Sequence, residues 1–240
     1  MKMRYLSIAT FSLLLLLPVL EARAEVSART DRQGSYVMTH VLPSGPSSNA
    51  QIWASRRGRG AARSFVALNP DGDIHGDLWP TVAESPRAPY HPWVMWSRPD
   101  GDNQRLAWSR WIQGTWSPIQ WVDLKQQPVD QLDPGIAFND DGRPLAVWWS
   151  LDESGRGRIW ISVFLVTRWM EPFAVSDPLV DARLPEINVT PQGYIDVDFD
   201  TPDGRVSQMV MFSEPVTITD DINPQGRIWL KGLPVPMQEH

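Results

Sequence analysis

Cysteine is absent from this 240-residue chain. No disulfide can form and no thiolate is available for a zinc site, so an apolar core must hold the fold together. The four histidines show no His-x-x-x-His or Glu-x-x-His spacing, and no Gly-x-Ser-x-Gly sequence marks a hydrolase nucleophile. We therefore assign no catalytic residue from the sequence, and we expect no cofactor other than a calcium ion.

Long apolar runs are also lacking, except at the N-terminus. Lys2 and Arg4 precede the apolar stretch 6–20, and a small-residue site ending at Ala24 follows it. This order is typical of a secretory signal. The alternative, a membrane anchor, needs about 20 apolar residues, and this stretch is shorter and contains Pro18. We expect a signal peptide over residues 1–24 and one mature domain over residues 25–240, either periplasmic or secreted and not membrane-spanning.

Positive charge is in short supply as well. The formal net charge is −6 at pH 7, and removal of the basic signal makes the mature chain more acidic. An acidic domain is poorly suited to binding nucleic acid. Sustained helical periodicity is missing after the signal, whereas 22 prolines and 16 glycines punctuate short apolar runs. This pattern predicts an all-β fold.

An internal repeat organises the mature chain. The segments 79–83, 133–137 and 184–188 match one another, each with proline in second position. A later strand, ending in serine in three cases, starts at residues 52, 106, 159 and about 206, so the steps are 54, 53 and about 47 residues. Four short strands in a unit of about 50 residues are the signature of a propeller blade.

We therefore predict a propeller-like array of about four four-stranded repeats, over residues 25–78, 79–131, 132–183 and 184–218. A further strand at 226–230 is a candidate for closing the ring. Four units make a small propeller, so a fifth unit or closure by homo-oligomerisation is the alternative. A β-sandwich is the alternative architecture.

The repeat unit resembles the blades of sialidase-like and bacterial lectin propellers. The shared features are a proline, a strand ending in tryptophan, a polar turn with glycine, a strand ending in serine, and a Trp-x-x-Pro-like turn. The sialidase Asp-box, Ser-x-Asp-x-Gly-x-x-Trp, is not met, and its nearest counterpart is the segment 150–155. The resemblance implies contact with glycans and assigns no residue.

Tryptophan is the most over-represented residue, with 13 in the chain. Trp96 and Trp148 occupy equivalent strand ends, which predicts packing between blades. Trp93, Trp111 and Trp149 are not repeated, so they are candidates for stacking on a sugar ring. Because Trp149 follows Trp148 on a strand, the two side chains should point to opposite faces.

Charged candidates are few. Arg56, Arg57 and Arg59 form the only basic run, which the repeat places in a hairpin loop, where it is either solvated or bound to an acidic ligand. Asp196, Asp198 and Asp200 alternate along a predicted strand and share one face, as either a solvated edge strand or a calcium site. The pairs 140–141 and 152–153 are alternative acid and base residues of a glycosidase, although carboxylates in turns are usually solvated.

These features favour an exported, non-enzymatic binding protein of a bacterial envelope, with a glycan or a partner protein as ligand. One alternative is a sialidase-like, glycan-active enzyme. The other is a scaffold or assembly factor that docks another envelope protein through its tryptophan-rich surface.

The N-terminal pattern generates a direct test of export. Protein isolated from the periplasm or the medium should begin at Glu25 when it is sequenced from its N-terminus. A cytoplasmic product that keeps Met1 would contradict the assignment.

Overall fold

The computed structural model describes residues 26–30, 36–43, 50–57, 65–68, 76–87, 91–124 and 130–210. The expected signal peptide and the closing strand at 226–230 lie outside these residues. Strands, turns and bends make up the described part, which contains no helix. Accordingly, the search of this part for an apolar helix long enough to span a membrane finds none.

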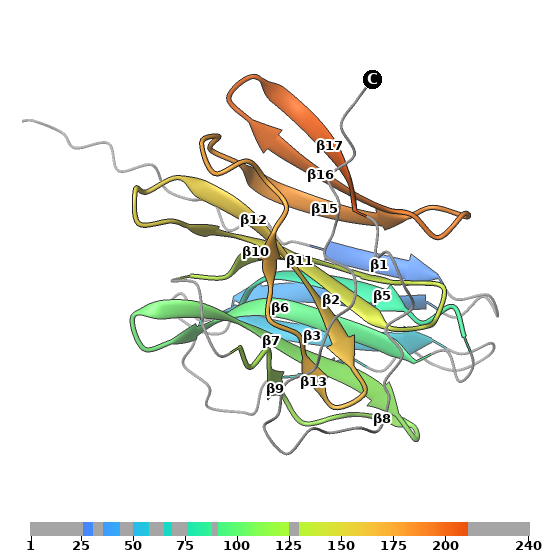
Figure 1. Ribbon diagram of the computed structural model, residues 1–240. Helices are drawn as coiled ribbons and strands as arrows, with labels where there is room; N and C mark the ends of the chain where they lie inside the picture. Colours follow the sequence, from blue (N-terminus) through green and yellow to red (C-terminus); the bar gives the residue numbers. More distant parts are fainter. Residues whose placement is uncertain are drawn as a thin grey trace, which may run out of the picture.

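Four small antiparallel sheets follow one another along the chain (Figure 1). The first contains β1 (Val26–Thr30), β2 (Tyr36–Pro43), β3 (Ala50–Arg57) and β4 (Phe65–Ala67). The second contains β5 (Leu78–Glu84), β6 (Pro92–Asp100), β7 (Asn103–Ile112), β8 (Thr115–Trp116) and β9 (Gln120–Trp121).

The third sheet contains β10 (Leu132–Phe138), β11 (Pro144–Leu151), β12 (Gly157–Leu165), β13 (Arg168–Trp169) and β14 (Phe173–Ala174). The fourth contains β15 (Arg183–Val189), β16 (Ile195–Thr201) and β17 (Gly204–Val210). The predicted all-β, propeller-like array of about four sheets is confirmed. The first sheet has the predicted four strands, the second and third have five, and the fourth has three within the described residues.

The internal repeat is visible in the backbone hydrogen bonds. The carbonyl oxygens of the third strands at Ile52, Leu106 and Ile159 each accept a hydrogen bond from the residue 16 positions later, at 2.8, 2.9 and 2.8 Å. The donors are the amides of Leu68, Val122 and Val175. These acceptors are the residues at which the sequence predicted the third strand of each unit to start.

Three apolar clusters lie between successive sheets and form the core. The first, which includes Ile52 and Trp96, joins the first two sheets. The second, which includes Trp93 and Trp148, joins the second and third sheets. The third, which includes Leu145, joins the third and fourth sheets. Trp96 and Trp148 are both fully buried, each against the preceding sheet, so their predicted packing role is confirmed.

The fourth sheet differs from the second and third because only one of its faces carries a core cluster. Ile187, Val197 and Phe199 point into the third cluster. The alternate residues on β15 and β16 are polar and exposed or half-buried. They are Glu186, Asn188, Asp196, Asp198 and Asp200. Within the described residues, the array of sheets therefore ends in a polar face.

The packing of Trp148 generates a stability prediction. Trp148→Ala should lower the free energy of unfolding by about 3–5 kcal/mol, because it removes a large, fully buried ring. Denaturant unfolding measures this loss. Tyr194→Ala is the control, since that ring is 41% exposed and the change should stay within about 0.5 kcal/mol. Equal losses in both variants would contradict the core assignment.

Candidate functional site

The first strand of each of the last three sheets begins with the same irregularity. Each of these strands shifts its register with the second strand of its own sheet. The shift lies between Leu78 and Thr81 in β5, between Leu132 and Gly135 in β10, and between Arg183 and Glu186 in β15. Inside each shift lies a residue followed by a buried proline. These residues, which we call the bulge residues, are Trp79, Asp133 and Leu184, and their φ angles are 51°, 49° and 53°.

A left-handed backbone is unusual at these positions for two reasons. Residues other than glycine rarely adopt positive φ, and the residue before a proline favours an extended backbone. Such strain persists only where the surrounding structure enforces it, and it is concentrated at functional sites. Its recurrence in three sheets marks the bulge residues as candidates for function.

The three first strands run in the same direction, with matching ends together. Beyond the end of β5, Arg87 Nε donates a hydrogen bond to Asp140 O at 2.5 Å, beyond the end of β10. Beyond the end of β15, Gly193 lies against Asp140, because a Cβ atom there would be 2.6 Å from Asp140 Oδ2. Since the three strands are equally long, their starts gather at the opposite end. We call this opposite end the bulge end.

Matching hydrogen bonds fix the segments that enter β10 and β15. Before β10, Asp130 Oδ1 accepts a hydrogen bond from Gln104 N at 2.8 Å, and Gln131 N donates to Gln104 O at 2.8 Å. Both bonds are made with Gln104, which belongs to β7, the third strand of the preceding sheet. The connection between sheets is thus held against β7 immediately before the Asp133 bulge.

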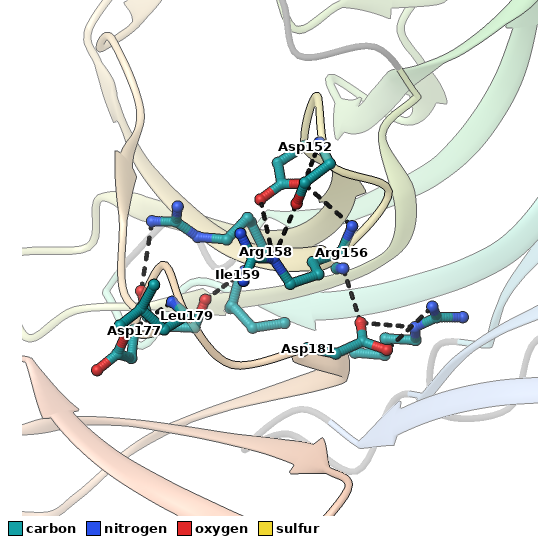
Figure 2. A network of polar contacts seen from close by, with 11 residues as sticks. Asp152, Arg156, Arg158, Ile159, Asp177, Leu179 and Asp181 are labelled. Carbon is teal, nitrogen blue, oxygen red and sulfur yellow. Dashed lines mark hydrogen bonds and ion pairs between the residues drawn. The ribbon is translucent and has the colours of Figure 1, made fainter.

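The connection before β15 has the same construction (Figure 2). Asp181 Oδ1 accepts a hydrogen bond from Gly157 N at 2.7 Å, and Ala182 N donates to Gly157 O at 2.9 Å. Glycine is required at 157, because a Cβ atom would overlap Ala182 O and approach Arg183 Cγ to 2.8 Å. Arg183 in turn donates two hydrogen bonds to the Asp181 carboxylate, at 3.0 and 3.1 Å.

Gly135 brings β10 and β15 together next to the Asp133 bulge. A Cβ atom at this position would lie 2.9 Å from Val147 Cγ2 and 3.2 Å from Ile187 Cγ2. The absence of a side chain therefore lets β15 approach closely. As a result, Asp133 lies within electrostatic reach of Glu186, the neighbour of Ile187 on β15.

Asp133 is the carboxyl with the most distinctive environment at the bulge end. Burial, and secondarily the negative charge of Glu186, raise the pKa of Asp133 from 3.8 to about 6. The hydrogen bonds and ion pairs of the described residues include none to its carboxylate. Asp133 therefore changes its charge near pH 6 and has no hydrogen-bonding partner for its carboxylate among the described residues.

Glu186 has a cationic neighbour, unlike Asp133. Arg205 Nη2 lies 2.7 Å from Glu186 Oε2, and Arg205 Nη1 lies 3.1 Å from Asp200 Oδ1. These carboxylates outweigh the effect of desolvation and raise the pKa of Arg205. The bulge end thus combines the Asp133 carboxyl, two carboxylates joined by Arg205 (Glu186 and Asp200), and two apolar side chains, Trp79 and Leu184.

Trp149 is the predicted ligand-binding residue that lies at this end. It pairs with Leu132 across the ladder, next to Asp133. Its ring packs on the third core cluster, opposite to Trp148, which confirms the expected opposite orientation. The guanidinium of Arg183 lies 5.3 Å from its ring centroid, so Trp149 is partly covered.

The two other tryptophan candidates lie elsewhere. Trp93 is only 4% exposed and stacks on Trp108 with ring centroids 4.3 Å apart, so it packs in the core between the second and third sheets. Trp111 belongs to β7. It is half-buried, makes an edge-to-face contact with Trp116 at 5.4 Å, and lies at the end of β7 remote from the bulges.

The charged candidates also differ from the expectation. Arg56 and Arg57 are the last residues of β3 rather than part of a loop, and Arg59 lies outside the described residues. Asp196, Asp198 and Asp200 share one face, as predicted, but β16 is the middle strand of its sheet rather than an edge. Among the described side chains, no group of three or more acids or histidines is arranged to hold a metal ion.

The acidic pairs in turns have structural roles. Asp152 Oδ1 accepts hydrogen bonds from Ser154 Oγ at 2.6 Å and from Arg156 N at 3.0 Å, and these bonds lower the pKa of Asp152 (Figure 2). Asp141 pairs with Arg87 at 3.4 Å. A general acid needs a raised pKa, so Asp152 is unsuited to that role.

The bulge residues were missed by the sequence analysis, although the signal was present. The aligned segments at 79–83, 133–137 and 184–188 each contain the bulge residue and its proline. The first aligned position is the bulge residue itself. Its side chain differs between repeats: tryptophan, aspartate or leucine.

Comparison with known proteins places the fold but not the family. No family model and no curated protein matches the chain. A protein of unknown function from Dyadobacter fermentans has a TM-score of 0.59 at 12% identity, over 78% of this chain and 64% of that chain. An N-acetylgalactosamine deacetylase from F. plautii has a TM-score of 0.53 at 12% identity, over 78% and 66%.

The endo-arabinase of Bacteroides thetaiotaomicron has a TM-score of 0.51 at 15% identity, over 81% of this chain and 75% of that chain. Other glycoside hydrolases and a sialidase share the fold as well. The chain spans slightly less than two thirds of the first two structures. At these identities the likeness shows a common all-β fold.

The environment of Asp133 generates a pH-dependent stability prediction. Between about pH 4 and pH 6 the folded protein holds a proton on Asp133 that the unfolded chain has released, so this group makes stability fall as the pH rises. Asp133→Asn removes that dependence and should raise the melting temperature relative to the parent protein more at pH 7.5 than at pH 4. Thermal unfolding at both pH values measures the difference, and a difference independent of pH would contradict the raised pKa.

Proposed function

We propose that this protein binds a glycan at the bulge end of its first strands. The observation that carries the proposal is the left-handed pre-proline bulge, repeated in three sheets, which presents Trp79, Asp133 and Leu184 at one end of the array. Proteins that act on glycans share the fold, which supports this class of ligand.

The side chains at this end suit a sugar chemically. Sugars offer apolar ring faces and many hydroxyl donors. Trp79 provides an aromatic surface for stacking, and Leu184, 50% exposed, provides a second apolar contact. Asp133 and Glu186 provide carboxylate oxygens that accept hydrogen bonds from hydroxyl groups. Ligand-binding sites usually combine apolar surfaces with a small number of well-positioned polar groups.

A second candidate is hydrolysis of the bound glycan. The pKa of Asp133, about 6, suits a general acid near neutral pH. Glu186, within electrostatic reach of Asp133, is an exposed second carboxylate. In this alternative Asp133 donates a proton to the leaving oxygen as the glycosidic bond breaks, and Glu186 accepts a proton from the water molecule that attacks the anomeric carbon. Glycoside hydrolases among the proteins with this fold support the alternative.

The location of the activity follows from the expected signal peptide. We propose that the mature chain meets its ligand in the periplasm or outside the cell. A scaffold role in an envelope complex is the competing proposal, and it requires no glycan at the bulge end.

Binding is tested by a glycan array followed by calorimetry on the captured oligosaccharide. Trp79→Asn and Asp133→Asn should each weaken binding at least about tenfold, because each removes a proposed contact worth about 1.4 kcal/mol or more. Asparagine tolerates positive φ, so both variants keep the backbone of the bulge. Trp111→Ala, at the opposite end of β7, is the matched control and should bind like the parent protein.

The same oligosaccharide distinguishes the two candidates. Binding without new reducing ends indicates a binding protein, whereas release of reducing ends that Asp133→Asn abolishes indicates a hydrolase. Loss of binding in Trp111→Ala, with full binding in Trp79→Asn, would contradict the site.

A further inference from the structure

The arginines at the bulge end are already bound to carboxylates. Five arginines near the starts of the first and third strands each have an acidic partner. The pairs are Arg98–Asp77 at 3.4 Å, Arg105–Asp100 at 2.7 Å, Arg156–Asp152 at 3.8 Å, Arg183–Asp181 at 3.0 Å and Arg205–Glu186 at 2.7 Å.

The two arginines nearest to Asp133 and Glu186 are the most fully engaged. Arg205 uses both terminal nitrogens, one for Glu186 and one for Asp200. Arg183 donates from Nε and Nη2 to one carboxylate and also lies over the ring of Trp149. A ligand carboxylate that took either guanidinium would compete with an existing charge-assisted pair and leave that carboxylate without its partner.

Arg158 is the remaining arginine at the starts of these strands in the described part, and it faces the outer side of the third sheet. Its Nη2 donates to Ser176 O at 3.4 Å (Figure 2). Its guanidinium lies 5.7 Å from the centroid of the Trp160 ring. Ser176 belongs to the connection after β14, on the far side of β12 from β10. Arg158 is therefore separated from the bulge strand β10 by β11, and its guanidinium points to the opposite side of β12.

Negative charge is in excess at the same place. Asp133 has no counter-charge among the described residues, and Asp198 lies opposite Glu186 in the ladder of β15 and β16. Arg205 faces three carboxylates, those of Glu186, Asp200 and Asp198. Fields of one sign repel ligands of the same sign and set selectivity among partners.

We infer that the bulge end selects uncharged glycans over glycans that carry carboxylates. This inference rests on the proposed glycan-binding function and specifies the class of its ligand. An uncharged sugar donates its hydroxyl groups to Asp133 and Glu186 without disturbing the arginine pairs. A sialylated or uronic-acid glycan brings a carboxylate to a site where acidic groups prevail and the nearby arginines are occupied.

The test compares glycans that differ only in charge. Oligogalactosides and oligogalacturonides of equal length, together with sialylated and unsialylated versions of one trisaccharide, are measured by calorimetry at pH 7.5 and low salt. The parent protein should bind at least one uncharged member, and at least about tenfold more tightly than its charged counterpart. Added salt should narrow the difference, because it screens the repulsion.

A double variant reverses the charge balance. Asp133→Asn combined with Glu186→Gln removes two carboxylates and frees one side of Arg205, so the preference for the uncharged member should shrink or invert. Asp141→Asn removes one carboxylate at the opposite end of β10 and is the control that should keep the preference.

Three outcomes are informative. Tighter binding of the charged member by the parent protein would overturn the inference and leave the glycan-binding function standing. Equal selectivity in the double variant and the parent protein would assign the preference to another part of the chain and overturn the inference as well. Failure to bind any glycan of the array or the matched pairs would overturn the proposed function, and the inference with it.

Discussion

The placement of β10 between two neighbouring sheets is the constraint on which the bulge end depends. β10 lies against β5 on one side and β15 on the other, and Gly135 provides the space for β15. The connection that enters β10 is held to β7 through Asp130 and Gln131. With both its entry and its flanks fixed, the strand has little freedom to relax the left-handed residue at its start.

This construction explains how strained residues persist at the bulge end. An isolated positive φ before proline would relax to an extended backbone. Here, the buried proline and the hydrogen-bonded entry segment oppose relaxation. The free energy of these contacts offsets the strain of the left-handed residue. The bulge also shifts the register with the second strand. The side chain of the bulge residue therefore departs from the regular alternation of side chains between the two faces of the sheet. Backbone geometry that recurs for structural reasons thus presents side chains that are free to differ.

Much of the fold was predictable because repetition leaves its mark on composition. Third strands of equal construction require similar residues at Ile52, Leu106 and Ile159, and Trp96 and Trp148 meet the same inter-sheet space. The alternation of Asp196, Asp198 and Asp200 with buried neighbours likewise follows from the two-residue period of a strand. These features depend on local patterns that the sequence displays directly.

The site was harder to predict, because its properties depend on contacts between sheets. Nothing in the segment around Asp133 indicates that Glu186, 53 residues later, contributes to its raised pKa. Trp93 shows the opposite difficulty: it has no counterpart in the other repeats, yet it stacks on Trp108 in the core. The lack of a counterpart predicts a functional role, but a space between sheets filled by several large rings does not require the same ring in each repeat.

A better guide is variation at a position where the backbone is the same. Trp79, Asp133 and Leu184 occupy one structural position and share a strained conformation, but they differ in size, polarity and charge. Packing keeps similar residues at some equivalent positions, as at Trp96 and Trp148. The divergence at the bulge residues is expected if each contacts a different part of one asymmetric ligand, and a chain of sugars, with apolar faces and polar edges, is asymmetric in this way.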